Sequence, residues 1–426
     1  MDKQGQKDED SGKEDDMENK KLTKLEKYWI MYDVGNSAFV MLIATIIPIY
    51  FNYLAKSAGI SEVNYLAYWG YAASVSTVIV ALIGPALGSI ADMQNYKKPL
   101  FTISMMVGVI GCAAMSFPTS WVIFLAVFVI AKVGYNASLI FYDSMLVDIT
   151  STDRMDEVSS QGYAWGYIGS CIPFILSLVL VLMYEKIGIT MHMAMTGAFI
   201  LNAVWWAVVT IPLLRNYRQK NYVAVPSHSV KNSFKRLGQT FMDVHKEKKI
   251  FWYLLAFFFF IDGVYTIIEM ATAYGSALGL DSTGLLLALL VTQIVAFPCA
   301  LICAKLSGKY PTERLIGVCI VAYIGIALFA IQLDKQWEFW TLAVLVGMFQ
   351  GAIQALARSY FAKIIPAEKS GEYFGIYDIC GKGASFMGTT LVGIVAQVTG
   401  VANAGVAVIA VLFVIGYILF KKAVRA

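Results

Sequence analysis

Two segments of the sequence, GSIADMQNYKK at residues 88–98 and AKLSGKYPTER at residues 304–314, lie 216 positions apart, and each follows a long apolar run. A second pair, residues 144–157 and 359–372, repeats at an offset of 215 and places charged side chains in a polar turn. Two nearly equal offsets indicate that the chain consists of two related halves.

Twelve apolar runs surround these segments, and each is close to the roughly 20 residues that cross a bilayer core as a helix. The composition agrees, because 58% of the residues are apolar and 15% are charged, against about 25% charged in typical soluble proteins. The expected spans are residues 28–54, 64–91, 99–117, 120–148, 161–184, 192–214, 250–279, 282–307, 313–332, 338–364, 372–398 and 402–420. This pattern predicts an all-α membrane protein with 12 transmembrane helices in two six-helix bundles, and it excludes a soluble enzyme.

Polar segments divide the chain into four parts. Residues 1–27 carry mixed charges and almost no large apolar side chains, which predicts a disordered cytosolic tail. The two bundles occupy residues 28–214 and 250–426. Residues 215–249 between them hold nine Lys or Arg against two acids, which predicts a basic cytosolic linker.

Lys and Arg gather in alternate loops, together with the tail and the linker. Cytosolic loops retain these residues, so we expect both termini in the cytosol and the protein in the cell membrane.

No motif for catalysis or for a bound cofactor is found. The six cysteines lie within apolar runs without a CxxC pair, and the three histidines are scattered. Nucleotide-binding, zinc-protease and serine-hydrolase motifs are absent from the sequence. We therefore expect no enzyme, no metal and no cofactor, and a net charge of +4 is too small to indicate nucleic-acid binding.

The motifs resemble those of a known family. Residues 88–98 resemble the loop 2–3 signature of the major facilitator superfamily, with Met93 and Asn95 where Arg and Gly are usual. YDVGNSAF at residues 32–39 resembles the first-helix motif of its vacuole-effluxer-like branch, and residues 262–275 and 354–382 support the likeness. The resemblance implies two pseudo-symmetric bundles and secondary transport of amino acids or similar solutes. Gly308 stands where a second-half Asp is usual, which implies a weaker second-half gate.

Charged side chains within spans are candidates for function, because a charge at the bilayer centre costs several kcal/mol. Asp262 is the best-placed acid, roughly 18 Å into its span. Other polar side chains share helical faces with these charges, and the resemblance implies that spans 1, 4, 7 and 10 line one cavity. The predicted solute and ion cavity residues are Asp33, Asn36, Lys132, Tyr135, Asn136, Asp143, Asp262, Glu269, Gln350, Gln354, Arg358, Asp378 and Lys382.

Structural interpretations compete with this one. Asp378 and Lys382 are four residues apart and suit a local ion pair, Asp33 with Asn36 suits bonding to a neighbouring helix, and Arg358 suits an interaction with headgroups. Our hypothesis is that Asp262, with Glu269 or Asp33, binds the driving proton, and that Lys132 or Arg358 meets an anionic group of the solute.

A second set of residues is predicted to form a gate between the halves. Gly88 permits close backbone approach, and Asp92 suits a helix N-terminus or a basic partner. Charged turns at equivalent positions of the two halves suit ion pairs that hold an outward-open state. The predicted gating residues are Gly88, Asp92, Lys97, Lys98, Asp153, Arg154, Glu368, Lys369 and Glu372.

The sequence thus predicts a monomeric secondary active transporter that moves a small polar solute by alternating access, with a proton or a sodium ion as coupling ion and the lipid bilayer as its solvent. The alternative is a solute sensor derived from a transporter, or a lipid scramblase, without coupled transport. Counterflow of labelled solute distinguishes transport from simple binding.

Overall fold

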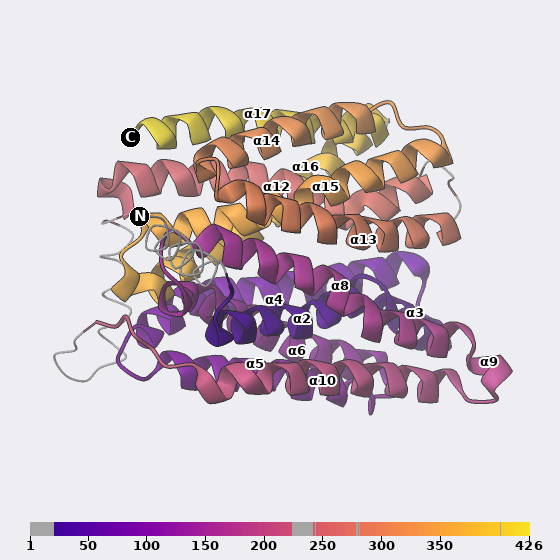
Figure 1. The fold of residues 1–426 in the computed structure, drawn as a ribbon. Helices are drawn as coiled ribbons and strands as arrows, with labels where there is room; N and C mark the ends of the chain where they lie inside the picture. The colour runs from indigo at the N-terminus through magenta and orange to yellow at the C-terminus, as the bar shows by residue number, and fades with distance from the viewer. Residues whose placement is uncertain (1–20, 224–241, 243, 278–279, 281, 401) are drawn as a thin grey trace, which may run out of the picture.

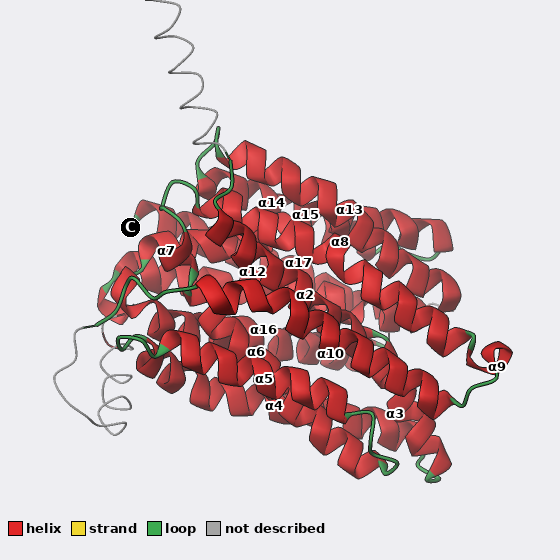
Figure 2. Ribbon diagram, turned by 60° about the horizontal axis from the view of Figure 1, so that its bottom comes forward, coloured by secondary structure: helices red, strands yellow, loops and turns green. Residues whose placement is uncertain are grey.

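A computed structural model of the protein describes residues 21–223, 242, 244–277, 280, 282–400 and 402–426. Most of the predicted tail (1–27) and most of the predicted linker (215–249) lie outside the described residues. Within them, twelve segments are long and apolar enough to cross a membrane, as the sequence predicts. Short loops join most of these helices (Figure 2).

The helices fall into two halves, which Figure 1 shows as a lower indigo-to-magenta group and an upper orange-to-yellow group. The first half contains α2 (Lys24–Ala44), α3 (Ile46–Ser57), α4 (Glu62–Ala91), α5 (Lys97–Ala114), α6 (Trp121–Ser144), α7 (Leu146–Ile149), α8 (Met155–Leu182), α9 (Tyr184–Ile187) and α10 (Met191–Asn216). The second half contains α12 (Lys248–Ala277), α13 (Ser282–Ser307), α14 (Thr312–Ala330), α15 (Gln336–Ile364), the short 3-10 helix η1 (Ala367–Lys369), α16 (Ser370–Thr399) and α17 (Ala402–Arg425).

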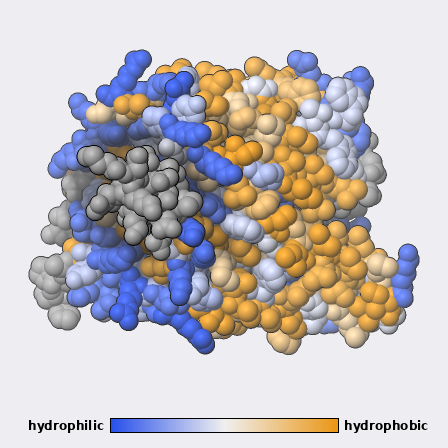
Figure 3. Space-filling view, in the orientation of Figure 1, coloured by the Kyte–Doolittle hydropathy of each residue, from blue (hydrophilic) through white to orange (hydrophobic). Residues whose placement is uncertain are grey.

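The surface has an apolar belt between two more polar ends. Figure 3 shows the belt in orange and the hydrophilic residues, in blue, gathered mainly at one end. Large apolar side chains within the spans, such as Leu82, Ile110, Val208 and Ile418, are exposed. Such a surface suits lipid rather than water, so the protein is an integral multi-pass membrane protein. We call the end where α2 begins and α17 ends the termini side (Figure 1).

The first span begins earlier than the sequence predicts and is broken in its middle. Helix α2 begins at Lys24 because a capping box precedes it, in which the backbone amide of Glu26 donates to Thr23 Oγ1 and the amide of Thr23 donates to the Glu26 carboxylate. Helix α2 ends at Ala44 and α3 begins at Ile46. Pro48 lacks the amide that would continue the helical bonding, which explains the break.

Two helices of the first half, α4 and α8, make the main contacts with the second half. Helix α4 packs on α16, and α8 packs on α13 and α15. At the first crossing a Cβ added to Gly88 would lie 2.1 Å from the backbone oxygen of Gly371, and one added to Gly375 would lie 2.6 Å from Pro85. The glycines therefore set how closely the two halves approach on the termini side.

Candidate functional site

A buried arginine joins the two halves. Arg358 on α15 is 2% exposed, and its Nη1 donates to Asp143 Oδ1 on α6 at 3.0 Å. Nη2 donates to Asp33 Oδ2 on α2 at 3.3 Å, and Nε donates to Ser159 Oγ on α8 at 3.0 Å. Nη2 also donates to the Ser159 backbone oxygen at 3.1 Å. The interpretation that Arg358 reaches the headgroups is therefore wrong, because its guanidinium is satisfied inside the protein.

Aromatic rings surround the same guanidinium. Its carbon lies 4.6 Å from the ring centroid of Trp29, 4.6 Å from that of Tyr163 and 5.4 Å from that of Tyr142. Such distances are in the range of cation–π attraction. The three rings and the two carboxylates all belong to the first half, whereas the cation belongs to the second.

A second contact between the halves, which we call the Asp92 contact, lies at the end of α4. Asp92 accepts hydrogen bonds from the backbone amides of Gly371, at 2.7 Å, and Glu372, at 2.8 Å, in the first turn of α16. Carboxylates are stabilised at this position by free amides and the helix dipole. Burial nevertheless raises the pKa of Asp92 to about 7, although the charge of Lys97 and these two amides favour the ionised form.

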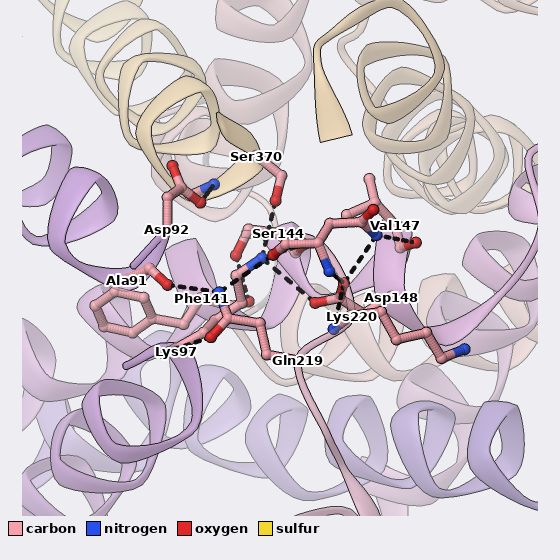
Figure 4. A network of polar contacts seen from close by, with 12 residues as sticks. Ala91, Asp92, Lys97, Phe141, Ser144, Val147, Asp148, Gln219, Lys220 and Ser370 are labelled. Atoms are coloured by element: carbon pink, nitrogen blue, oxygen red, sulfur yellow. Dashed lines mark hydrogen bonds and ion pairs between the residues drawn. The ribbon is translucent and has the colours of Figure 1, made fainter. Parts of the chain in front are cut away.

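Lys97 completes the Asp92 contact. Its fully buried Nζ donates to Ser370 Oγ of the second half at 2.9 Å and forms an ion pair with Asp148 Oδ2 at 3.4 Å (Figure 4). Asn95 in the preceding turn has a φ of 66°. Asn tolerates this left-handed conformation, so it can occupy the position where the family pattern has Gly.

Asp148 also holds the start of the linker. It accepts hydrogen bonds from Tyr217 Oη at 2.5 Å and from the backbone amides of Lys220 and Asn221 at 3.1 and 2.8 Å. Gln219 donates to the backbone oxygen of Ala91 at 3.0 Å (Figure 4). Residues 217–223 thereby tie the linker to the end of α4 and the end of the fourth span.

A third contact between the halves, which we call the Asp156 contact, lies at the start of α8. Asp156 is 3% exposed and accepts hydrogen bonds from Ser359 Oγ at 2.5 Å and Thr312 Oγ1 at 2.5 Å. Lys363 Nζ lies 2.6 Å from Asp156 Oδ2 and also donates to Thr312 Oγ1 at 3.0 Å. All three donors belong to the second half.

Asp262 lies apart from these contacts. It is fully buried on α12, and its Oδ1 accepts hydrogen bonds from the backbone amide of Gly388 on α16, at 3.0 Å, and from Thr266 Oγ1, at 3.3 Å. Its Oδ2 has no hydrogen-bond partner among the described residues. A Cβ added to Gly388 would lie 2.3 Å from Asp262 Oδ1, so this approach requires a glycine.

The other predicted cavity residues take several positions. Lys382 and Asp378 form the local ion pair expected from their spacing. Asn36 donates to the backbone oxygen of Tyr32 and to Asp33, and Gln354 donates to Tyr167 Oη of the first half at 3.3 Å. The structure leaves Lys132 and Tyr135 partly buried and Glu269 exposed, and it buries Asn136 and Gln350.

The other predicted gating side chains are mostly exposed or partly exposed. Asp153 and Glu368 are exposed, and Lys98 and Lys369 are partly exposed. Arg154 pairs with Glu26 at 3.3 Å and with Glu157 at 3.5 Å, both in its own half. These two ion pairs of Arg154 therefore stabilise the first half.

Sequence reasoning missed several residues that the structure places at the contacts, among them Asp148, Asp156, Ser159 and Lys363. Asp148 and Lys363 are equivalent at the repeat offset of 215, and they carry opposite charges. The two segments are otherwise similar, so this reversal of charge was a signal that could have identified Asp148 and Lys363.

The sequence is similar to a family of transporters. The family model described as "Vacuole effluxer Atg22 like" matches residues 23–153 and 147–425. An uncharacterized MFS-type transporter of Bacillus subtilis, YxiO, is 41% identical over 405 residues, which cover 94% of this chain and 95% of the relative. Autophagy-related protein 22 of Coccidioides immitis is 21% identical over 413 residues, covering 78% of this chain and 68% of the relative.

Solved structures show the same fold. The major facilitator superfamily transporter FucP in its outward conformation aligns with a TM-score of 0.71 at 10% identity, covering 94% of this chain and 97% of FucP. A bacterial homologue of the iron transporter ferroportin in its outward-facing state aligns with a TM-score of 0.69 at 13% identity, covering 95% and 99%. The predicted fold of two six-helix bundles is confirmed.

Proposed function

The chain belongs to the vacuole effluxer Atg22-like family of major facilitator transporters, and on that premise we propose that it is a proton-coupled secondary active transporter. Its solute is a small polar molecule, an amino acid or a related metabolite. It works as a monomer in the cell membrane by alternating access, with both termini in the cytosol. The concentration of Lys and Arg in the loops of the termini side supports this orientation.

The distribution of contacts between the halves supports alternating access. Among the described residues, the polar contacts that join the halves lie between the termini side and the middle of the spans. This arrangement is the one expected when the cytosolic side is closed. Opening that side requires the Asp92 contact, the Asp156 contact and the bonds of Arg358 to separate.

One observation supports a proton as the coupling ion. Asp262 is fully buried within a span, and one of its oxygens has no partner among the described residues. An unpaired carboxylate in such a place is costly, whereas a protonated carboxyl carries no charge. A sodium ion would require several oxygen ligands, but two of the groups beside Asp262 Oδ1 are a backbone amide and a hydroxyl that donate to it.

The test uses proteoliposomes and the replacement Asp262→Asn. Asn keeps the shape and the hydrogen bonds at Oδ1 but cannot exchange a proton. We expect labelled amino acid to exchange by counterflow in this variant, whereas accumulation driven by an imposed pH gradient is lost. Asp153→Asn, which changes an exposed acid, serves as the control and should retain both activities.

Each part of the proposal has its own contrary outcome. Full proton-driven accumulation by the Asp262→Asn variant would show that Asp262 is not the proton site. Absence of counterflow by the natural protein for every amino acid and dipeptide offered would show that the solute class is wrong.

A further inference from the structure

The side chains around Arg358 form a binding box for a flat cation, and every wall of this box belongs to the first half. We call it the Arg358 box. Its walls come from α2, α6 and α8, and only the guanidinium inside it comes from α15. The residues of the box are Trp29, Asp33, Tyr142, Asp143, Ser159 and Tyr163.

Two walls of the box, Trp29 and Tyr142, hold each other in place without help from Arg358. Trp29 Nε1 donates to the backbone oxygen of Tyr142 at 3.0 Å, and Tyr142 Oη donates to the backbone oxygen of Trp29 at 3.1 Å. The two rings stack with centroids 4.4 Å apart and an interplanar angle of 15°. A site whose walls are fixed in advance loses little conformational entropy when it binds a ligand.

A glycine in α8 leaves room for the cation. A Cβ added to Gly162 would lie 2.4 Å from Asp33 Oδ2 and 3.2 Å from Arg358 Nη2. Any larger residue at this position would displace the carboxylate that faces the guanidinium. The absence of a side chain at position 162 therefore lets the first half enclose the guanidinium of Arg358 closely.

Separation of the halves empties this box. Arg358 moves with the second half, and Asp33 and Asp143 remain with the first. Removing one partner of a buried ion pair is strongly unfavourable, because the charge that stays behind is not compensated. The open state is therefore stabilised by any cation that can take the place of the guanidinium.

We propose that the Arg358 box, when it opens to the termini side, binds an organic cation of the guanidinium or primary ammonium class, and that Arg358 is its built-in competitor. The inference rests on the alternating access of the proposed function and deepens it, because it gives the solute a cationic group. An amino acid carries such a group in its ammonium.

The chemistry of the walls favours an organic cation over a metal ion. The box offers three aromatic faces, which attract flat or alkylated cations. Its oxygen ligands are two carboxylates, one hydroxyl and one backbone oxygen. The described residues contain no group of three or more His, Cys, Asp or Glu that could hold a metal ion.

The first experiment empties the box by mutation and refills it with a small molecule. In the Arg358→Ala variant of the full chain, purified in detergent, methylguanidinium should raise the Tm in a saturable way. At ten times its Kd, it should raise the ratio of folded to unfolded protein about elevenfold. The natural protein in its closed state, where Arg358 fills the box, should show a smaller effect.

The control for this experiment removes the carboxylates as well. In the variant that combines R358A with D33N and D143N, methylguanidinium should have no more effect than sodium chloride at the same ionic strength. An equal rise in Tm in both variants, or no saturable rise in the R358A variant, overturns the proposal.

A second experiment keeps Arg358 and does not depend on the folding of R358A. Ser160 on α8 donates to Cys303 Sγ on α13 at 3.9 Å, across the two halves. In the Ser160→Cys variant an oxidant should join residues 160 and 303 by a disulfide when the termini side is closed. The other five cysteines (Cys112, Cys171, Cys299, Cys319 and Cys380) are replaced by Ala to avoid other pairs.

Methylguanidinium that binds the open box should slow this cross-linking, because it lowers the ratio of closed to open protein about elevenfold at ten times its Kd. Replacing Asp33 and Asp143 by Asn should remove the effect. Cross-linking that is insensitive to methylguanidinium overturns the proposal. This outcome is distinguishable from a failure of the proposed function, because counterflow and proton-driven accumulation are measured without the cross-link.

Discussion

The Asp92 contact and the Asp156 contact occupy equivalent places in the two halves, but they are built in opposite ways. Asp92 is at the end of α4 and binds backbone amides at the start of α16. Gly308 is the repeat equivalent of Asp92 at the crossing of α8 with the second half. The carboxylate of this crossing is instead Asp156, in the first turn of α8. There it binds side chains of α14 and α15.

The sign of a neighbouring charge is also reversed. Asp148 beside Lys97 corresponds to Lys363 beside Asp156. In both contacts the first half supplies the acid that reaches across to the second half. The two halves thus keep the contacts at equivalent positions, but at the second crossing the carboxylate comes from the first half, at Asp156, instead of from position 308 of the second half. The missing Asp at position 308 therefore does not leave the second crossing without a carboxylate.

The largest effect should come from closing the glycine crossing beside the Asp92 contact. A Cβ at position 88 would lie 2.1 Å from the backbone oxygen of Gly371, and a backbone atom cannot move aside as a flexible side chain can. We expect Gly88→Ala to destabilise the closed state by about 3 kcal/mol, at the upper end of the range for overpacking. Cross-linking of residues 160 and 303 should then slow roughly a hundredfold.

Gly70→Ala, in the same helix, is the matched control for this variant. Gly70 has no atom within 4 Å of an added Cβ, so the cross-linking rate should not change. Equal rates for the two variants would show that the glycine crossing does not limit closure.

The next largest effect should come from the Asp156 contact. Asp156→Asn leaves Lys363 without its counter-ion, and the side chain of Lys363 is 19% exposed, so water compensates part of the loss. We expect the closed state to lose about 2 kcal/mol, less than for a fully buried pair. Cross-linking should slow roughly thirtyfold. The exposed acid Asp153, replaced by Asn, should have no such effect, and Lys363→Met combined with Asp156→Asn should recover part of the rate.

The Asp92 contact should respond to pH. The pKa of Asp92 is about 7 in the closed state, above the ordinary value for an Asp side chain. When the termini side opens to water, we expect the pKa of Asp92 to return to that ordinary value. A raised pKa means that protonation stabilises the closed state at low pH, and that this stabilisation is lost as the pH rises through about 7. Between about pH 6 and 8 the closed-to-open ratio should fall about tenfold.

Cross-linking measured relative to the Asp92→Asn variant at each pH checks this dependence, because the effect of pH on the thiols cancels in the ratio. The Asp156→Asn variant should keep the dependence on Asp92. A ratio that stays constant between these pH values would contradict the assignment to Asp92.

The sequence predicted the fold well because its signals are strong. Runs of about 20 apolar residues and the repeat offsets of 215 and 216 specify twelve spans in two halves. The ends of the spans were less predictable where a cap sets them. The first helix, for example, begins at Lys24 because Thr23 and Glu26 form a capping box. The break at Thr45 depends on Pro48, which a hydropathy pattern does not register.

The sites were less predictable because they depend on which helices face each other. Asp33 and Asp143 could be selected as charges within spans, but nothing in their own segments indicates that Arg358 lies between them. Asp156 was missed for a related reason. Asp156 lies in the same charged segment as Asp153, and the sequence does not show which of the two acids is buried. The packing of α8 on α15 buries Asp156 and leaves Asp153 exposed.

The smallest effect should come from restoring the family pattern at the second crossing. Gly308→Asp places a carboxylate where the repeat has its equivalent of Asp92, and an added Cβ there has only the Lys305 backbone oxygen at 3.7 Å as a neighbour. Because Asp156 already binds the donors at this crossing, the cross-linking rate should change less than about threefold, corresponding to roughly 0.5 kcal/mol. In the Asp156→Asn background the same replacement should also fail to restore the rate. Asp92 reaches the first turn of α16 beside Gly371, where an added Cβ would lie 2.8 Å from Asp92 Oδ1. The equivalent position of the second crossing, residue 156, carries a side chain instead. Restoration of the rate would instead show that the two contacts can exchange their carboxylates.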